Sequence, residues 1–444
     1  MQTQISFLAT LALSSALCGC AQAQTDAAAP APNAPVKVAA PVQTDIASGI
    51  LSQSAQVWIG GSRAWPDYIA PGAAPQWKFL ADNADGFYIN NFALRLTDKT
   101  LKLTPTMEAR IAALQTMNDR LKSDKLFYET DQQHSTNQFE QTALANFAKT
   151  GFDVTAVTIN RGTNPQRSAI LTDDGKRPLY YMFGPWRGGG DINNDENKEL
   201  RENIAKFGGS AVDGPVTMWR KNAGKMKPMV YSTIQWTQQH GQKFLYLLAP
   251  NESGAGFLEE SQKLAHDLED NGANPDIWAV AFYGPPKFRD ALETLPEALP
   301  DGAPAKTFSG AAYWLIHHLR DPDDALKLTL DSQRARQFDF TLANSSVWLD
   351  LAPVVRARFD GPLPAGLQMK WTIGERDVTE QINGQGLVFN RDLRLQPGDK
   401  RELKLQIAGE TKGASLPFQL ELMPHPSTPI VKQSLALRVT ENIE

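Results

Sequence analysis

The sequence predicts a (β/α)8 barrel of the TIM type over residues 48–332, followed by an antiparallel β-sandwich over residues 333–444. Two observations predict the barrel: short apolar runs alternate with segments of helical periodicity, and this alternation continues for about 280 residues. A third observation predicts the sandwich, because alternation of apolar and polar residues replaces the helical periodicity from Gln337 onward. An open, doubly wound sheet is the alternative architecture for the first part.

The composition is that of an ordinary soluble globular protein of 444 residues, a length that suits two or three domains. The formal net charge is −5, and the sequence contains no long basic run. Because binding of a phosphate backbone requires clustered Lys and Arg, this charge pattern argues against nucleic acid as the main partner.

The first 23 residues have the features of an export signal. Ile5 to Leu17 is apolar but too short to span a bilayer. The segment LCGC that ends at Cys20 resembles a bacterial lipoprotein box, which would leave Cys20 lipidated as a membrane tether. Alternatively, the segment AQA that ends at Ala23 is a signal-peptidase site. Both routes predict export, to the periplasm, to the outer membrane as a lipoprotein, or to the medium.

Residues 24–47 are rich in Ala and Pro, which predicts a disordered linker because this composition cannot bury a core. Both cysteines, Cys18 and Cys20, precede the linker. No disulfide and no Cys-based metal site or nucleophile is therefore expected in the mature chain.

Seven strand–helix units are expected in the barrel region. The expected strands are 57–61, 86–91, 125–131, 154–159, 179–183, 243–249 and 277–283. The expected helices are 76–83, 104–121, 138–150, 195–207, 226–240, 257–270 and 309–319. Residues 216–219 are the weaker candidate for the eighth strand, in sixth place along the chain. Residues 168–172 are either an inserted strand or a helix, followed by a hairpin-type turn at Asp173–Lys176, which fits neither architecture without an insertion.

The last part of the chain shows the alternation of half-buried strands. It is clearest at Phe338, Phe340 and Leu342, at Leu403, Leu405 and Ile407, and at Leu435, Leu437 and Val439. Turn sequences such as Asn383-Gly384 and Pro397-Gly398 separate the runs. We interpret this sandwich as an accessory domain.

Residues that carry chemistry in such a barrel follow the carboxyl ends of the strands. The side chains found there are acids, amides, an Arg or a large aromatic ring: Trp58, Asn90, Asn91, Glu129, Asp131, Asn160, Arg161, Trp186, Arg187, Asn251, Glu252 and Tyr283. No His ends a strand, and Gly-x-Ser-x-Gly, His-Glu-x-x-His and phosphate-binding loop motifs are absent from the sequence.

Paired carboxylates with amides and aromatic rings are the groups that sugar hydrolysis requires. We predict Glu252 as the acid/base, with Glu129 or Asp131 as its partner. Strand alternation places Glu129 and Asp131 on one face. The structural alternatives are that Glu252 caps the following helix or is solvated on its loop, and that Glu129 and Asp131 are helix-entry carboxylates. The remaining residues of the set are predicted to bind substrate, a poly- or oligosaccharide.

Asn251-Glu252, directly after a buried strand, resembles the Asn-Glu pair of the large clan of retaining (β/α)8 glycoside hydrolases. In that clan the Glu is the acid/base and the Asn contacts the sugar, so the resemblance implies these roles for Glu252 and Asn251. The clan's pair closes the fourth strand, whereas this pair closes a later one. The export segment, the barrel and the C-terminal sandwich are together similar to many secreted glycosidases.

Two other classes of function stay open. A metal-assisted phosphodiesterase or lyase would use His134 with Glu129 and Asp131. A non-catalytic glycan-binding surface lipoprotein would bind sugar without needing the charge of Glu252. The histidines other than His134 are expected on helices or at the surface.

Residues 191–202 place oxygen-bearing side chains at the spacing of a calcium-binding EF-hand loop, beginning with Asp191, Asn193 and Asp195. Glu196 stands where that loop requires Gly, and no helix is expected before it. We favour a helix N-terminus, at which Asn caps and acids interact well with the helix dipole. Apart from this calcium alternative, no cofactor is expected.

Overall fold

The computed structural model describes most of the chain after residue 50. The described residues are 51, 53–60, 75–90, 105–131, 136–160, 165–173, 175–184, 190–221, 223–250, 256–281, 302–304, 306–359, 366–379, 388–390, 393–409 and 415–440. Residues 45–444 form one compact unit. The predicted signal peptide and linker lie outside the described residues.

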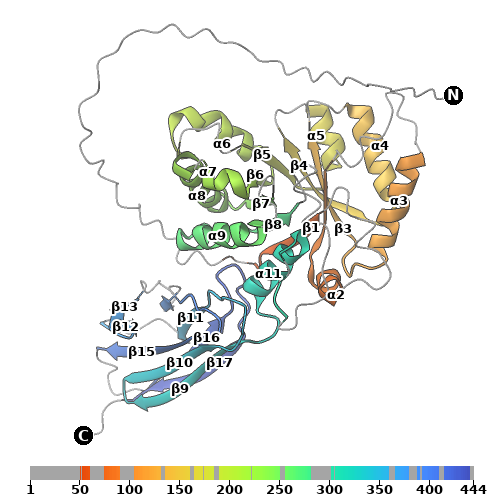
Figure 1. The fold of residues 1–444 in the computed structure, drawn as a ribbon. Helices are drawn as coiled ribbons and strands as arrows, with labels where there is room; N and C mark the ends of the chain where they lie inside the picture. The colour runs from red at the N-terminus through yellow and green to blue at the C-terminus, as the bar shows by residue number, and fades with distance from the viewer. Residues whose placement is uncertain are drawn as a thin grey trace, which may run out of the picture. The chain divides into compact units, whose positions relative to one another are not determined.

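Eight parallel strands form a closed barrel, in which each strand pairs with the next and β1 pairs with β8 (Figure 1). The strands are β1 (Gln56–Gly60), β2 (Gly86–Asn90), β3 (Lys125–Asp131), β4 (Asp153–Asn160), β5 (Leu179–Phe183), β6 (Gly209–Pro215), β7 (Lys243–Ala249) and β8 (Ile277–Val280). The closure confirms the predicted barrel and excludes the open sheet.

Helices follow the strands and cover the outside of the barrel (Figure 1). They are α2 (Pro75–Asn83), α3 (Pro105–Asn118), α4 (Asn137–Ala148), α5 (Pro165–Thr172), α6 (Lys198–Ala205), α7 (Val216–Lys221), α8 (Ala223–Gln239), α9 (Phe257–Asp270) and α11 (Phe308–Arg320). A single 3-10 turn at Asp195–Asn197 leads into α6. Among the described residues, no helix is both long and apolar enough to cross a membrane.

Two local predictions were wrong. The sixth strand is β6, seven residues long, whereas residues 216–219 belong to α7. The turn at Asp173–Lys176 is not a hairpin, because residues 168–172 belong to α5, in agreement with the helix alternative, and the turn joins this helix to β5. The barrel therefore needs no insertion at this point.

The interior of the barrel is filled by one cluster of side chains that alternate with outward-facing neighbours. Its members are Trp58, Tyr88, Phe127, Ala156, Tyr180, Met182, Ala211, Leu245, Leu247, Ile277, Ala279 and Ala281. The large aromatic residues come from β1, β2, β3 and β5, whereas β4 and β6 contribute alanines. A barrel with a packed interior presents its chemistry at its mouth, above this layer.

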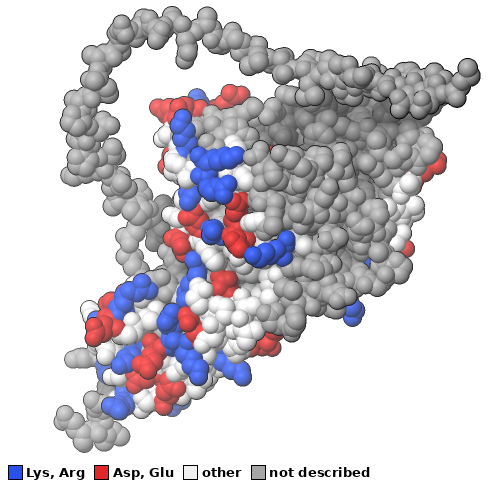
Figure 2. All heavy atoms as spheres, in the orientation of Figure 1, with Lys and Arg blue, Asp and Glu red and all other residues white. Residues whose placement is uncertain are grey.

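Two antiparallel sheets follow the barrel, as predicted (Figure 1). One sheet contains β13 (Arg376–Asp377), β12 (Gln368–Ile373), β15 (Lys400–Ala408), β10 (Gln337–Asn344) and β9 (Leu326–Arg334), in that order. The other contains β14 (Val388–Asn390), β11 (Val354–Phe359), β16 (Leu416–Met423) and β17 (Gln433–Val439). Because β9 begins at Leu326, the sandwich starts before the expected residue 333. On the face that Figure 2 shows, basic and acidic side chains are interspersed.

Barrel and sandwich share backbone hydrogen bonds as well as side-chain contacts. The amide of Leu51 donates to the carbonyl of Pro426 at 3.0 Å, and the amide of Ala55 donates to that of Ser427 at 2.6 Å. The residues that lead into β1 are thus held by a loop between the last two strands of the sandwich, β16 and β17.

Candidate functional site

The mouth of the barrel is organised by the register of β2, β3 and β4. Asn90 pairs with Glu129, and Glu129 pairs with Thr158, so these residues form one row at the carboxyl ends of three adjacent strands. Further along, Asp131 pairs with Asn160. Parallel strands bring their carboxyl ends to the same edge, which is where the sequence analysis expected chemistry.

Glu129 faces the interior of the barrel, because it is two residues beyond Phe127 of the interior cluster. Its side chain is 5% exposed. The hydroxyl of Tyr88 on β2 donates to Oε2 of Glu129 at 2.9 Å, and the same hydroxyl lies 3.4 Å from Oγ1 of Thr158 on β4. Three strands therefore fix the direction of this carboxyl group. Glu129 was predicted from the sequence, whereas Tyr88 was not, because only strand alternation marks it there.

Trp58 lies lower in the barrel than its predicted role requires. The ring is 3% exposed, stacks edge-on against Phe127 with 5.4 Å between centroids, and lies over the Cα of Gly86. Its Nε1 donates to Oε1 of Gln56 at 3.1 Å. In this arrangement protein atoms cover the ring, so Trp58 is a core residue and presents no face to a sugar.

Asp213 on β6 is an acidic residue that sequence analysis missed, because the predicted sixth strand began after it. It is two residues beyond Ala211 of the interior cluster, so alternation places it on the inward face. It lies near the carboxyl end of β6, and its side chain is half-buried. Asp213 thus adds a second described acid to the mouth, three strands from Glu129 in the barrel order.

The other predicted site residues are described incompletely or not at all. Asn90, Asp131 and Asn160 close β2, β3 and β4, but only their backbone positions are described. The residues outside the described part of the chain are Asn91, Arg161, Trp186, Arg187, Asn251, Glu252 and Tyr283, and His134 with them. The predicted pairing of Glu252 with Glu129 or Asp131 stays a prediction.

A second buried glutamate lies on the opposite side of the same strand. Glu140 of α4 is fully buried and accepts hydrogen bonds from the hydroxyls of Tyr128, at 2.9 Å, and Thr130. Tyr128 faces outward, as do the other even-numbered residues of β3. Burial, followed by the charge of Glu140, raises the pKa of Tyr128 well above its ordinary value. Glu140 therefore ties a helix to the barrel wall, outside the mouth.

Around the predicted calcium loop, the polar atoms form hydrogen bonds with one another. Oδ1 of Asp191 accepts from the backbone amide of Asn193 at 2.8 Å and from its side-chain amide at 3.1 Å. The carbonyl of Asp191 accepts from Nδ2 of Asn197 at 2.5 Å. Asn194, which precedes the 3-10 turn, makes no side-chain capping bond. Calcium binding at Asp191, Asn193 and Asp195 stays a prediction.

The described histidines and acids that approach one another closely enough for metal binding lie elsewhere. They form two groups that share His318: His266, His318 and Asp350, and Glu269, His318 and His425. His266, Glu269 and His318 lie toward the carboxyl ends of α9 and α11. Because barrel helices run antiparallel to the strands, these ends lie at the bottom of the barrel, opposite the mouth.

Comparison with known proteins gave no family and no curated relative, since no family model and no curated protein matches the chain. Solved structures do match. A mutant tryptophan synthase α-subunit from Pyrococcus furiosus is 8% identical, with a TM-score of 0.33, over 61% of this chain and 98% of its own. The phosphoribosylanthranilate isomerase of Pyrococcus furiosus is 9% identical, with a TM-score of 0.30, over 51% of this chain and 88% of its own.

A calcium-binding mutant of Bacteroides uniformis β-glucuronidase 2 is 10% identical, with a TM-score of 0.30. That match covers 82% of this chain but 42% of the glucuronidase. Resemblances at this level of identity carry no information on function, because one fold hosts many activities.

Proposed function

We propose that this protein is an exported glycoside hydrolase that cleaves a poly- or oligosaccharide with a pair of carboxylates at the mouth of its barrel. The observation that carries the proposal is the position of Glu129. It lies at the carboxyl end of a barrel strand, faces inward, and accepts a hydrogen bond from the Tyr88 hydroxyl at 2.9 Å. A carboxylate fixed in this way suits attack on the anomeric carbon or activation of a water molecule.

The second carboxylate in this proposal is Glu252, which follows β7 and would protonate the leaving oxygen. Asp213 lies on β6, which neighbours β7 in the barrel, and is the alternative to Glu252 as the second carboxylate. Amide side chains at the ends of β2 and β4, Asn90 and Asn160, would bind sugar hydroxyls. The carbohydrate is thus recognised by acids and amides, without a cofactor.

The proposal is tested by comparing Glu129→Gln with Glu140→Gln in the release of reducing ends from a broad panel of glycans. The two glutamates form a matched pair. Both are buried, and each accepts a hydrogen bond from a tyrosine hydroxyl at 2.9 Å, but Glu129 faces the inside of the barrel, whereas Glu140 of α4 faces the outer side of β3. Glu129→Gln is expected to lower kcat by about 10²–10⁴-fold, the usual contribution of a positioned acid or base. Glu140→Gln is expected to lower the melting temperature while the folded fraction keeps its kcat.

Several outcomes would count against the proposal. Equal activity of Glu129→Gln and wild type would remove Glu129 from the mechanism, and an equal loss in both variants would show that the loss reflects folding. Cleavage that stops on addition of a chelator would favour a metal-assisted phosphodiesterase or lyase. Binding of a glycan without cleavage, unchanged by Glu252→Gln, would favour a non-catalytic glycan-binding lipoprotein.

Once a substrate is found, proton NMR of the first product gives its anomeric configuration. Retention of the anomeric configuration would assign Glu129, or its alternative Asp131, as the nucleophile. Inversion would assign the same residue as the base that activates water.

A further inference from the structure

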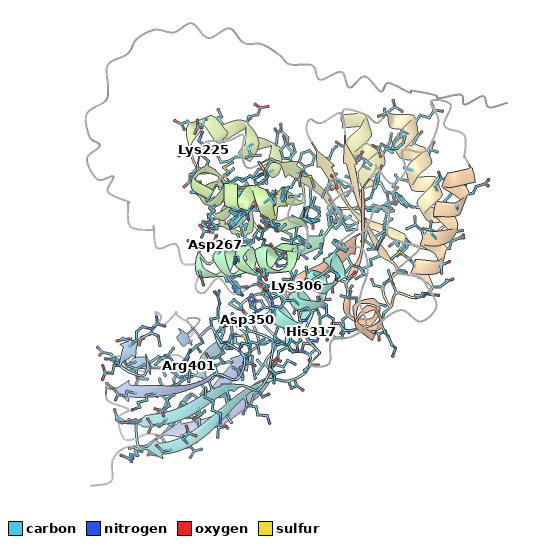
Figure 3. The ribbon with its side chains drawn as sticks, in the orientation of Figure 1. Lys225, Asp267, Lys306, His317, Asp350 and Arg401 are labelled. Atoms are coloured by element: carbon cyan, nitrogen blue, oxygen red, sulfur yellow. The ribbon has the colours of Figure 1, made fainter. Side chains whose placement is uncertain are left out.

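The joint between barrel and sandwich contains a buried network of ionisable side chains from both sides. The barrel contributes His266 and Glu269 on α9 and His318 on α11, two helices that contact each other. The sandwich side contributes Asp350, Arg394 and His425. Asp350, labelled in Figure 3, follows β10, whereas Arg394 precedes β15 and His425 follows β16.

The protonation of His318 follows from its two partners. The Nδ1 of His318 lies 2.8 Å from the backbone carbonyl oxygen of Asp350, which can only accept, so Nδ1 carries a proton. The Nε2 lies 2.8 Å from Oε1 of Glu269, which as a carboxylate also only accepts. Both ring nitrogens of His318 therefore donate, and the ring is an imidazolium. Its side chain is fully buried.

His425 has the opposite arrangement. Its Nδ1 accepts a hydrogen bond from the backbone amide of Ser427 at 2.9 Å, so this nitrogen carries no proton. Its Nε2 lies 3.1 Å from Oε1 of Glu269 and carries the single proton of a neutral ring. One oxygen of Glu269, Oε1, thus faces two imidazole N–H groups, one from the barrel and one from the sandwich.

The same assignments argue against a metal ion at either group of potential ligands. A histidine binds a metal through an unprotonated nitrogen while its other nitrogen donates a proton. In the group with His266 and Asp350, His318 faces Asp350 through Nδ1, and this nitrogen carries the proton that the carbonyl of Asp350 accepts. In the group with Glu269, His425 faces the carboxylate through Nε2, which carries the proton because Nδ1 accepts from Ser427. Each group therefore contains a histidine whose facing nitrogen is protonated. The network is therefore held together by hydrogen bonds and ion pairs.

Its carboxylates lie beside cationic groups. Glu269 is neutralised by His318 and by Nη2 of Arg394, which lies 3.0 Å from its Oε2 and 2.8 Å from Oδ1 of Asp270. Asp350 lies 3.7 Å from Nδ1 of His318, while its Oδ2 is 2.6 Å from Nε2 of His266. Breaking a buried pair by removing one partner leaves an uncompensated charge, which is strongly destabilising.

We propose that His318 is a buried imidazolium whose two ring N–H groups tie the barrel to the sandwich, so that the joint loosens when this ring loses its proton in alkaline solution. The groups that face it are Glu269 and His266 from α9, and Asp350 and His425 from the sandwich, with Arg394 behind Glu269. The neighbouring His317 turns to the other side of α11, where its Nε2 lies 3.4 Å from Asp323.

The pKa values of the network support this arrangement. Burial opposes the charged ring of His318, but the carboxylates of Glu269 and Asp350 outweigh it and raise its pKa from 6.5 to about 9. Burial opposes the charge of Glu269 as well, and the two histidines hold its pKa well below 4.5. The contribution of His318 is complete below pH 6.5 and is lost as the pH rises through about 9. That of Glu269 is complete above pH 4.5.

The experiment uses the full chain labelled with ¹⁵N, and records the ring nitrogens of its 6 histidines between pH 5 and 10. One ring is expected to keep both protons up to about pH 9, corresponding to a roughly 300-fold higher proton affinity than an ordinary histidine. Glu269→Gln is expected to lower the pKa of that ring. His318→Gln is expected to remove its signals and to abolish the fall in melting temperature between pH 6.5 and 9.5.

His240→Gln is the matched control, because His240 is an exposed histidine on the surface of the barrel with one ring nitrogen near the carbonyl of Trp236. This variant should change neither the ring signals of the network nor the fall in melting temperature between pH 6.5 and 9.5. If all six rings lose their second proton near pH 6.5, the proposal is wrong. It is also wrong if the purified protein holds stoichiometric zinc whose removal changes the ring signals. The titration of the histidine rings in the wild-type protein tests the proposal even if His318→Gln does not fold.

Discussion

The residue that ends α11, shortly before the sandwich, offers a direct test of the forces at the joint. Asp321 follows α11 in the left-handed conformation, with φ of 44°, and its side chain is fully buried. Its Oδ1 accepts from the amide of Ala325 at 2.8 Å, and its Oδ2 accepts from the amide of Leu326 at 3.1 Å. One carboxyl group thus ends the helix and starts β9.

Replacing Asp321 by Ala would leave both of these buried amides without a partner. Each unpaired amide costs about 1–3 kcal/mol, and holding Ala in a left-handed conformation costs about 1 kcal/mol more. We therefore expect Asp321→Ala to lower the free energy of unfolding by about 3 kcal/mol at the least. Asp321→Gly should lose the hydrogen bonds without the backbone strain, and so should be about 1 kcal/mol more stable than the Ala variant.

Urea unfolding, followed by fluorescence and circular dichroism, measures these differences. Asp321→Asn is the conservative variant, because Asn tolerates the left-handed conformation and keeps one acceptor oxygen. Asp324→Ala is the positional control, since Asp324 also has a positive φ, 52°, but is exposed and pairs with Lys432 at the surface. A loss below about 1 kcal/mol in Asp321→Ala, or a loss as large in Asp324→Ala, would refute the reasoning.

Three further predictions concern the mouth, the barrel wall and the acidic range of pH. Tyr88→Phe removes the hydroxyl that orients Glu129 and should lower kcat about tenfold on a cleaved glycan, with the melting temperature as the check on folding. Gly86→Ala would bring a Cβ against the Trp58 ring and within 2.7 Å of the carbonyl of Lys125, so it should cost about 1–3 kcal/mol, whereas Gly224→Ala meets nothing within 4 Å and should cost nothing. Burial lowers the pKa of His425 below 6.5, so its neutral ring favours folding above pH 6.5, and stability should fall as the pH drops below that value. His425→Gln, measured by calorimetry between pH 7 and 5, should show a shallower fall.

Periodicity was enough to predict most of the fold. Phe338, Phe340 and Leu342 are buried and alternate with half-buried neighbours, as expected of a sandwich strand. The sixth barrel strand escaped detection because GSAVDGP contains only two apolar residues other than Gly and Pro between its ends. Small residues are required there, since a Cβ on Gly209 would strike the carbonyl of Lys243 and the ring of Tyr180. Strand propensity says nothing about such close approach.

The site was predicted less completely, for a physical reason. Strand ends identify which residues reach the mouth of a barrel, and this rule found Glu129. It did not find the Tyr88 hydroxyl, because that contact depends on the relative register of β2 and β3. The histidines at the joint were expected on helices or at the surface. His318 does lie on a helix, although it is buried, whereas His425 is buried and lies on no helix. Their partners come from segments far apart in the sequence, which no local pattern reports.

The backbone bonds from Leu51 and Ala55 to Pro426 and Ser427 affect the order in which the chain can fold during synthesis. A ribosome delivers the start of the barrel long before it delivers the loop that holds it. Until that loop emerges, the residues that lead into β1 lack their partners, and β1 cannot pair with β8 before Ile277–Val280 have been made. The first strand is therefore among the last to reach its final place.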